Sequence, residues 1–211
     1  MDTTRRVGLY SATASAALSI AYILGQLLEW QGLLGSAGGA ESTSTPLGIA
    51  VLLTPSLLLG CAFVTMMAAL HQTSLADRKA ISQAALAFAT MYATLVTLVY
   101  FVQLTLVGPR TSAGDMAEIE FLRFVPYRSF LFAVDLLGYS FMSLATLFGA
   151  FALPDTPPAR APRLFMLATG LLLPTIALQM YFPDLIWLAA LWGITFPAAM
   201  VLVAVMFAQA K

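Results

Sequence analysis

Long runs of apolar residues recur along the chain, separated by short polar or proline-rich links. Each run is long enough to cross a hydrocarbon core, which takes about 20 helical residues. The runs predict transmembrane helices at residues 8–30, 46–70, 82–107, 129–153, 164–182 and 185–208. The pattern therefore predicts an all-α polytopic membrane protein, a six-transmembrane-helix bundle that forms a single domain over residues 1–211. A lipid bilayer is its first expected partner.

Three prolines fall inside the predicted spans, where they remove backbone donors. We expect Pro55, Pro174 and Pro197 to kink the second, fifth and sixth helices. Pro55 and Pro174 also lie near the middle of the second helix of each three-helix half, where inverted-repeat transporters break helices. The two halves share no convincing sequence identity, so ordinary kinks are the favoured interpretation.

Basic residues are distributed unevenly between the two ends of the predicted bundle. In a six-pass plan only Arg110, Arg123 and Arg128 fall on one side. The other side carries Arg5, Arg6, Arg78, Lys79, Arg160, Arg163 and Lys211. Because cytoplasmic loops are enriched in Lys and Arg, this bias predicts that both termini are cytoplasmic. The predicted location is a bacterial-type inner (plasma) membrane, crossed several times.

The N-terminal run has a competing interpretation as a secretory signal peptide. Arg5 and Arg6 precede the apolar residues, and the small residues at 35–40 resemble a cleavage site. The run is longer than a usual signal-peptide core, however, and it carries Gln26, Glu29 and Trp30 near its end. These features favour a retained span.

Composition agrees with a membrane location and excludes several function classes. Hydrophobic residues make up 60% of the 211 residues and charged residues 9%, and the mean hydropathy is +0.88. Ten basic and ten acidic residues cancel, so no charge bias toward nucleic acid is present. The one cysteine, Cys61, can form no disulfide within the chain.

The residue inventory also argues against the common cofactors. With His71 as the only histidine, haem held by two histidines and multi-histidine zinc sites are excluded. Lys79 and Lys211 lie at or beyond the membrane edge, so neither can hold retinal as a Schiff base. No phosphate-binding loop or hydrolase signature is present. We therefore expect no cofactor, no metal and no catalytic residue set.

A level of polar residues crosses the outer half of the predicted bundle. Gln26, Gln103 and Gln179 each lie close to the outer end of a helix that runs outward, while Asp135 lies about 9 Å below the outer start of the fourth helix. Helical spacing adds three neighbours on the same faces: Glu29, Tyr100 and Tyr139. Polar groups facing lipid are costly, so these side chains should turn toward one another.

Asp135 is the residue of this level with the strongest functional signal. It begins a spacing of three and four residues through Gly138, Met142, Ala145 and Gly149, which predicts a packed inward face. No Lys or Arg lies within the spans to neutralise it. Glutamine alone is most simply explained as interhelical packing glue, whereas an intramembrane carboxylate is a functional-site candidate.

The connection over residues 108–128 is the longest outer link. Ser112 with Asp115 resembles a helix-capping pair, but the segment has no clean polar face. We expect it to lie at the membrane interface.

Two segments resemble a pattern in uncharacterised bacterial multi-spanning membrane proteins. They are YFVQLTLV at residues 100–107 and DLLGYSFMSLATLFGA at residues 135–150. The resemblance covers about a quarter of the chain and implies no activity. It favours the placement of Gln103 and Asp135 in one site.

These observations predict a protein that binds, or binds and transports, a small amphipathic or cationic ligand in a polar pocket of the outer half. Asp135 would anchor the ligand. The other expected ligand-binding residues are Tyr139, Gln103, Gln26, Gln179, Tyr100 and Glu29. Two alternatives remain: a non-catalytic subunit of a membrane complex, and an intramembrane enzyme that uses Asp135 and Tyr139 as acid and base. The expected protein partners are a second copy of the chain or the other members of such a complex.

Overall fold

The computed structural model describes residues 2–209, and every regular element in that range is a helix. Three 3₁₀ turns (η1, η3 and η4) occupy Ala76–Arg78, Glu120–Leu122 and Pro183–Leu185, and a π-helical turn (η2) occupies Gln103–Val107. The α-helices are α1 (Thr3–Trp30), α2 (Pro46–Thr73), α3 (Lys79–Val102), α4 (Gly108–Ala113), α5 (Phe130–Ala152), α6 (Arg160–Gly170), α7 (Leu173–Ala177), α8 (Ile186–Ala189) and α9 (Trp192–Gln209).

Within residues 2–209, five helical stretches are long and apolar enough to cross a membrane. They cover Thr3–Trp30, Pro46–Thr73, Ala76–Ala113, Phe130–Ala152 and Pro183–Gln209. The predicted all-α class and the membrane-protein class are therefore supported, and five of the six predicted spans have a counterpart.

The predicted fifth span, residues 164–182, is not one continuous helix. It is divided into α6 and α7, which are separated by a turn at residues 171–172. Pro174 has no N–H to donate to the carbonyl of Gly170, and its ring crowds that position, so the helix restarts with the proline in its first turn. The break is stronger than the expected kink. Pro55 and Pro197, by contrast, lie inside continuous helices.

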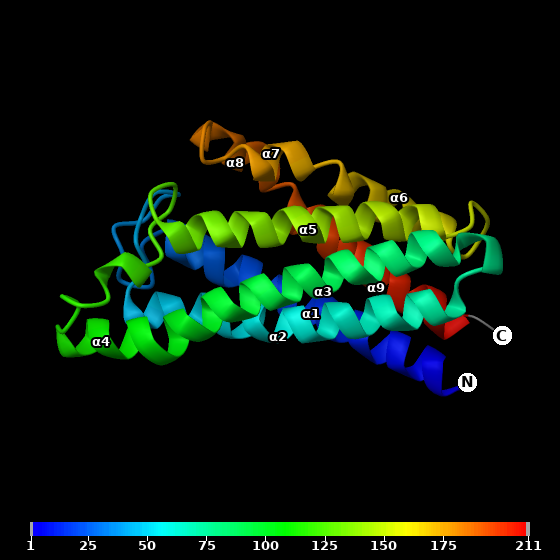
Figure 1. The fold of residues 1–211 in the computed structure, drawn as a ribbon, viewed down its shortest axis with the longest axis horizontal. Helices are drawn as coiled ribbons and strands as arrows, with labels where there is room; N and C mark the ends of the chain where they lie inside the picture. The colour runs from blue at the N-terminus through cyan, green and yellow to red at the C-terminus, as the bar shows by residue number, and fades with distance from the viewer. Residues whose placement is uncertain (1, 210–211) are drawn as a thin grey trace.

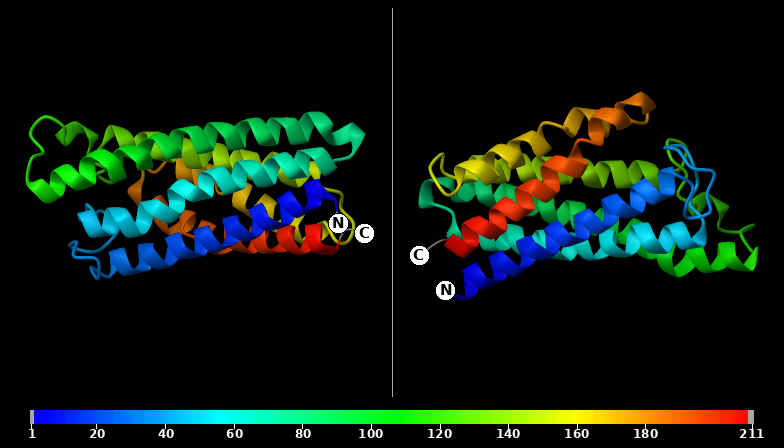
Figure 2. Two further views of the ribbon diagram at one scale, coloured as in Figure 1. Left: turned by 90° about the horizontal axis from the view of Figure 1, so that it is seen from below. Right: turned by 180° about the vertical axis from the view of Figure 1, so that it is seen from behind.

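The helices run side by side along the long axis of the molecule (Figure 1). The main packed pairs are α3 with α5, α1 with α2, α1 with α9, and α2 with α3. The start of α1, the end of α9 and the turns at 74–78 and 153–159 lie at one end, and two further views show the same arrangement (Figure 2). We call the opposite end, which carries the connections 31–45 and 114–129, the long-loop end.

Two basic residues donate hydrogen bonds to carbonyls at helix C-termini, at the end of the bundle that holds the start of α1. Lys79 donates to the carbonyl of Gln72 at 3.1 Å, near the end of α2. Arg78 donates to the carbonyl of Leu153 just after α5. Cations at these positions satisfy carbonyls that the helices leave unpaired. Lys211, which was assigned to the same side, lies outside the described residues.

The long connection after α3 differs from the expected capping arrangement. Ser112 lies in the last turn of α4 and donates to the carbonyl of Gly108 at 3.1 Å, so it does not start a helix. The six residues of α4 continue α3 through the π-helical turn. Pro109 explains the wide turn, because it cannot donate to the carbonyl four residues earlier and its ring crowds that group.

The predicted inward face of α5 is buried along its whole length, from Asp135 to Gly149. Two glycines on this face allow close packing. A Cβ at Gly138 would lie 2.8 Å from Val96 Cγ1 of α3, and one at Gly149 would lie 2.6 Å from Met166 Cε of α6. Because α5 is clamped between α3 and α6, the direction in which Asp135 points is fixed.

Candidate functional site

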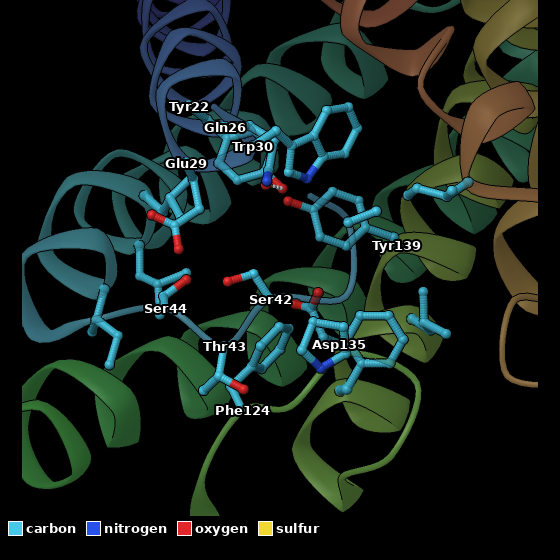
Figure 3. Close-up of a pocket in the computed structure, with 18 of the residues that line it drawn as sticks. Tyr22, Gln26, Glu29, Trp30, Ser42, Thr43, Ser44, Phe124, Asp135 and Tyr139 are labelled. Carbon is cyan, nitrogen blue, oxygen red and sulfur yellow. Dashed lines mark hydrogen bonds between the residues drawn. The ribbon is translucent and has the colours of Figure 1, made fainter. Parts of the chain in front are cut away.

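A cavity of about 290 Å³ opens among the helices at the long-loop end. Its walls come from α1, the start of α2, the end of α3, α5 and the segment from α7 to the start of α9. Loop residues 39–44 and 123–127 cover it. Figure 3 shows side chains from several of these elements converging on one open space.

All seven residues that the sequence singled out as a polar level line this cavity. The structure thus brings together side chains from α1, α3, α5 and the segment after α7. They are Gln26, Glu29, Tyr100, Gln103, Asp135, Tyr139 and Gln179. Their hydrogen bonding differs: the carboxyls have unpaired oxygens, the hydroxyls are hydrogen-bonded, and one amide holds a loop.

Asp135 projects into the cavity from the second turn of α5. The helix begins at Phe130 because Ser129 caps it, accepting a hydrogen bond from the Phe132 N–H at 3.2 Å. Asp135 is only 8% exposed, and its Oδ1 atom has no hydrogen-bond partner among the described residues. An unpaired carboxyl atom at such depth is costly unless a proton, a donor or a cation satisfies it.

Glu29 is a second buried carboxyl, near the end of α1. It is 2% exposed, and neither of its carboxyl oxygens has a hydrogen-bond partner within residues 2–209. Its Oε2 atom lies where Gly48 leaves room, since a Cβ on Gly48 would be 2.7 Å away. Gly48 is in the first turn of α2, whose N-cap is Thr45. The positive end of the α2 dipole therefore interacts favourably with a carboxylate at Glu29.

Three tyrosine hydroxyls and one amide are paired within the cavity wall. Tyr100 donates to the Tyr139 hydroxyl at 3.2 Å, and Tyr22 donates to Oε1 of Gln26 at 3.1 Å. The bond between Tyr100 and Tyr139 joins α3 to α5 beside Asp135, as their shared level predicted. Gln179 is buried in the same wall at 3% exposure.

Gln103 has a supporting role in this geometry. Its side-chain Nε2 donates to the carbonyl of Leu122 at 2.7 Å, and its Oε1 accepts from the N–H of Phe124 at 3.3 Å. Both ends of the amide are therefore engaged by the loop that carries Phe124 into the cavity wall. Gln103 holds this wall in place through a helix-to-loop contact, which differs from the interhelical hydrogen bond expected of a packing glutamine.

Aromatic rings form much of the remaining wall, and the sequence analysis did not single most of them out. Tyr139 meets the Trp192 ring edge-on, with centroids 5.6 Å apart, and Trp192 meets Tyr22 in the same way at 6.0 Å. The aromatic lining residues are Tyr22, Trp30, Tyr100, Phe124, Tyr127, Phe132, Tyr139 and Trp192. Clustering of Trp and Tyr at span ends was the available signal, but it is also typical of membrane anchors.

The loop side of the cavity is acidic. Burial raises the pKa of the Tyr127 hydroxyl above its usual range, and the nearby carboxylates of Glu41 and Asp184 raise it further. Tyr127 is also held at φ 60°, a left-handed conformation uncommon outside glycine. Among the described lining residues the only Lys, Arg or His is Arg123, which forms an ion pair with Glu120 at 2.9 Å.

Comparisons with protein-family models, with curated proteins and with solved structures found no match for the chain. In residues 2–209 there is also no group of three or more His, Cys, Asp or Glu side chains arranged to hold a metal ion. The site is therefore interpreted from its own chemistry. It combines two unpaired carboxyls, an aromatic wall and an acidic loop side.

Proposed function

We propose that this protein binds a small amphipathic cation in the cavity at the long-loop end, with Asp135 as the anchor. The observation that carries the proposal is the unpaired, buried Oδ1 of Asp135 in a cavity lined by aromatic rings. A carboxylate supplies a counter-charge and hydrogen-bond acceptors for an ammonium group. Aromatic faces attract the same cation and cover its apolar part.

In the membrane, the proposal places this cavity in the outer half of a six-pass protein with both termini cytoplasmic, in the inner membrane of a bacterial-type cell. The interrupted pair of α6 and α7 supplies the fifth crossing. Two observations support this plan: the start of α1 and the end of α9 lie at the same end of the bundle (Figure 1), and the basic residues Arg78 and Lys79 donate hydrogen bonds to helix-end carbonyls there. The acidic loop side then faces outward, where it attracts cations.

The first test is the effect of amines on thermal unfolding of the purified full chain. Hexylamine and tetraethylammonium should raise the unfolding temperature of the wild type, because a ligand at one hundred times its Kd adds about 2.7 kcal/mol to the stability of the folded state. Asp135→Asn keeps the side-chain shape but removes the charge, so it should abolish this response. Asp77→Asn, which changes an exposed residue at the other end of the bundle, should respond as the wild type does.

Equal stabilisation of the wild type and Asp135→Asn would remove Asp135 from the site and contradict the proposal. Transport is tested separately with the same variants in proteoliposomes. Uptake of the bound amine that depends on Asp135 would identify a transporter, and binding without uptake would identify a binding protein.

A further inference from the structure

The cavity carries two buried carboxyls with unpaired oxygens, and a single cation would pair with only one of these carboxyls. Asp135 enters from α5, and Glu29 enters from α1. Figure 3 shows the two side chains on different sides of the open space, with both carboxyl groups directed into it. Each residue is more than nine-tenths buried. Three of their four carboxyl oxygens lack a hydrogen-bond partner among the described residues: both of Glu29 and Oδ1 of Asp135.

Nothing in the described wall neutralises this pair of acids. Arg123, the one basic lining residue in residues 2–209, already pairs with Glu120 on the loop side. The α2 N-terminus beside Glu29 carries a partial positive charge of only about half an elementary charge. The Tyr100 hydroxyl gives Asp135 a hydrogen bond but no counter-charge, so each buried carboxylate still lacks a cation and carries a large desolvation cost.

The space between the two carboxyls suits a flexible apolar linker. The rings of Tyr22, Tyr139 and Trp192 form a continuous edge-to-face series along the wall. Rings of this kind pack against methylene groups and attract ammonium groups at their faces. Ser42, whose hydroxyl oxygen is also unpaired, points into the same space from the loop (Figure 3).

We propose that the ligand is an organic dication, a compound with two ammonium groups joined by a short alkyl chain, which bridges Asp135 and Glu29. This inference rests on the proposed function and specifies its ligand class. Each ammonium group donates hydrogen bonds to one carboxylate, and the alkyl chain lies along the aromatic wall. Both buried charges are then paired, and the two positive charges of the ligand cancel the charges of Asp135 and Glu29.

The test compares diamines with monoamines of equal chain length, measured by isothermal titration calorimetry on the full chain in detergent. The pairs are putrescine with butylamine, cadaverine with pentylamine, and hexamethylenediamine with hexylamine. Linking two binding groups makes the second contact intramolecular, so the best diamine should bind about a hundredfold more tightly than its monoamine, or more. The series also identifies the chain length that spans the two carboxyls.

Glu29→Gln separates this inference from the proposed function. The variant should lower diamine affinity to the level of the matching monoamine and reduce monoamine affinity far less than Asp135→Asn does, while Asp135→Asn should weaken both. Glu118→Gln, an exposed acid outside the cavity lining, is the matched control and should bind like the wild type.

Gly48→Ala provides a second variant that keeps both charges. Its new Cβ would lie 2.7 Å from Glu29 Oε2, so the carboxyl must move. Diamine affinity should fall, and monoamine affinity should not change. This variant covers the case in which Glu29→Gln fails to fold.

Three outcomes overturn the inference. If diamines and monoamines bind equally and both depend on Asp135, the dication proposal fails and the proposed function stands. If no amine binds the wild type, both fail. Binding of Mg²⁺ or Ca²⁺ that depends on both carboxyls, without diamine binding, would replace the organic dication with an inorganic one.

Discussion

Replacement of Gln103 by leucine tests whether one buried amide holds the loop wall of the cavity. Gln103 is fully buried, and its two hydrogen bonds reach the backbone of Leu122 and Phe124 at 2.7 and 3.3 Å. Leucine has a similar size, so packing against the neighbouring helices should change little. The carbonyl of Leu122 and the N–H of Phe124 would lose their partner.

The expected cost follows from these two bonds. A typical intramolecular hydrogen bond contributes about 0.5 to 1.5 kcal/mol net, so the loss of both should destabilise the closed loop by about 1 to 3 kcal/mol. The effect should be local, because the loop packs on the helices at one end only. Amide hydrogen exchange over residues 119–128 should therefore accelerate by roughly fivefold to a hundredfold, while exchange in α3 and α5 stays slow.

Hydrogen exchange with mass spectrometry measures this difference directly. The control is Gln83→Leu, since Gln83 is exposed on α3. Unchanged exchange of the loop in Gln103→Leu would refute the argument that this amide fixes the cavity wall.

Two further predictions concern the fold. A Cβ at Gly170 would lie 2.6 Å from Leu147 Cβ and 2.8 Å from its Cα. Because backbone atoms must move, Gly170→Ala should destabilise the protein by about 1 to 3 kcal/mol, measured by thermal unfolding. Gly39→Ala, which has open space around it but a positive φ, should show only a local effect. For topology, reporter fusions at residues 40, 77, 115, 158 and 211 should read out, in, out, in and in; a cytoplasmic signal at 115 would contradict the six-pass plan.

Hydropathy and helical spacing were sufficient to determine much of this protein. Length and apolar content predicted the helices that the structure places at α1, α2, α3, α5 and α9, because a membrane span must satisfy its backbone internally and therefore must be helical. The spacing through Asp135 predicted the buried face of α5. The helical rise placed Gln26 and Gln103 at one level, since long helices of known rise convert sequence position into height. Gln179 lines the same cavity although its predicted helix is broken at residues 171–172.

Contacts between distant segments determined the rest. Pro174 is visible in the sequence and predicted a kink, but the full break after Gly170 coincides with the close approach of Gly170 to Leu147 of α5, which no pattern within 164–182 contains. The position of Glu29 against the first turn of α2 depends on the path of the 31–45 connection. The hydrogen bond between Gln103 and the backbone of Phe124 depends on a loop that has no periodic pattern. The sequence therefore identified the polar residues and their common level. Only the tertiary structure decided which of them are bonded to backbone and which carboxyls face the cavity unpaired, because that depends on donors supplied by segments far away in the chain.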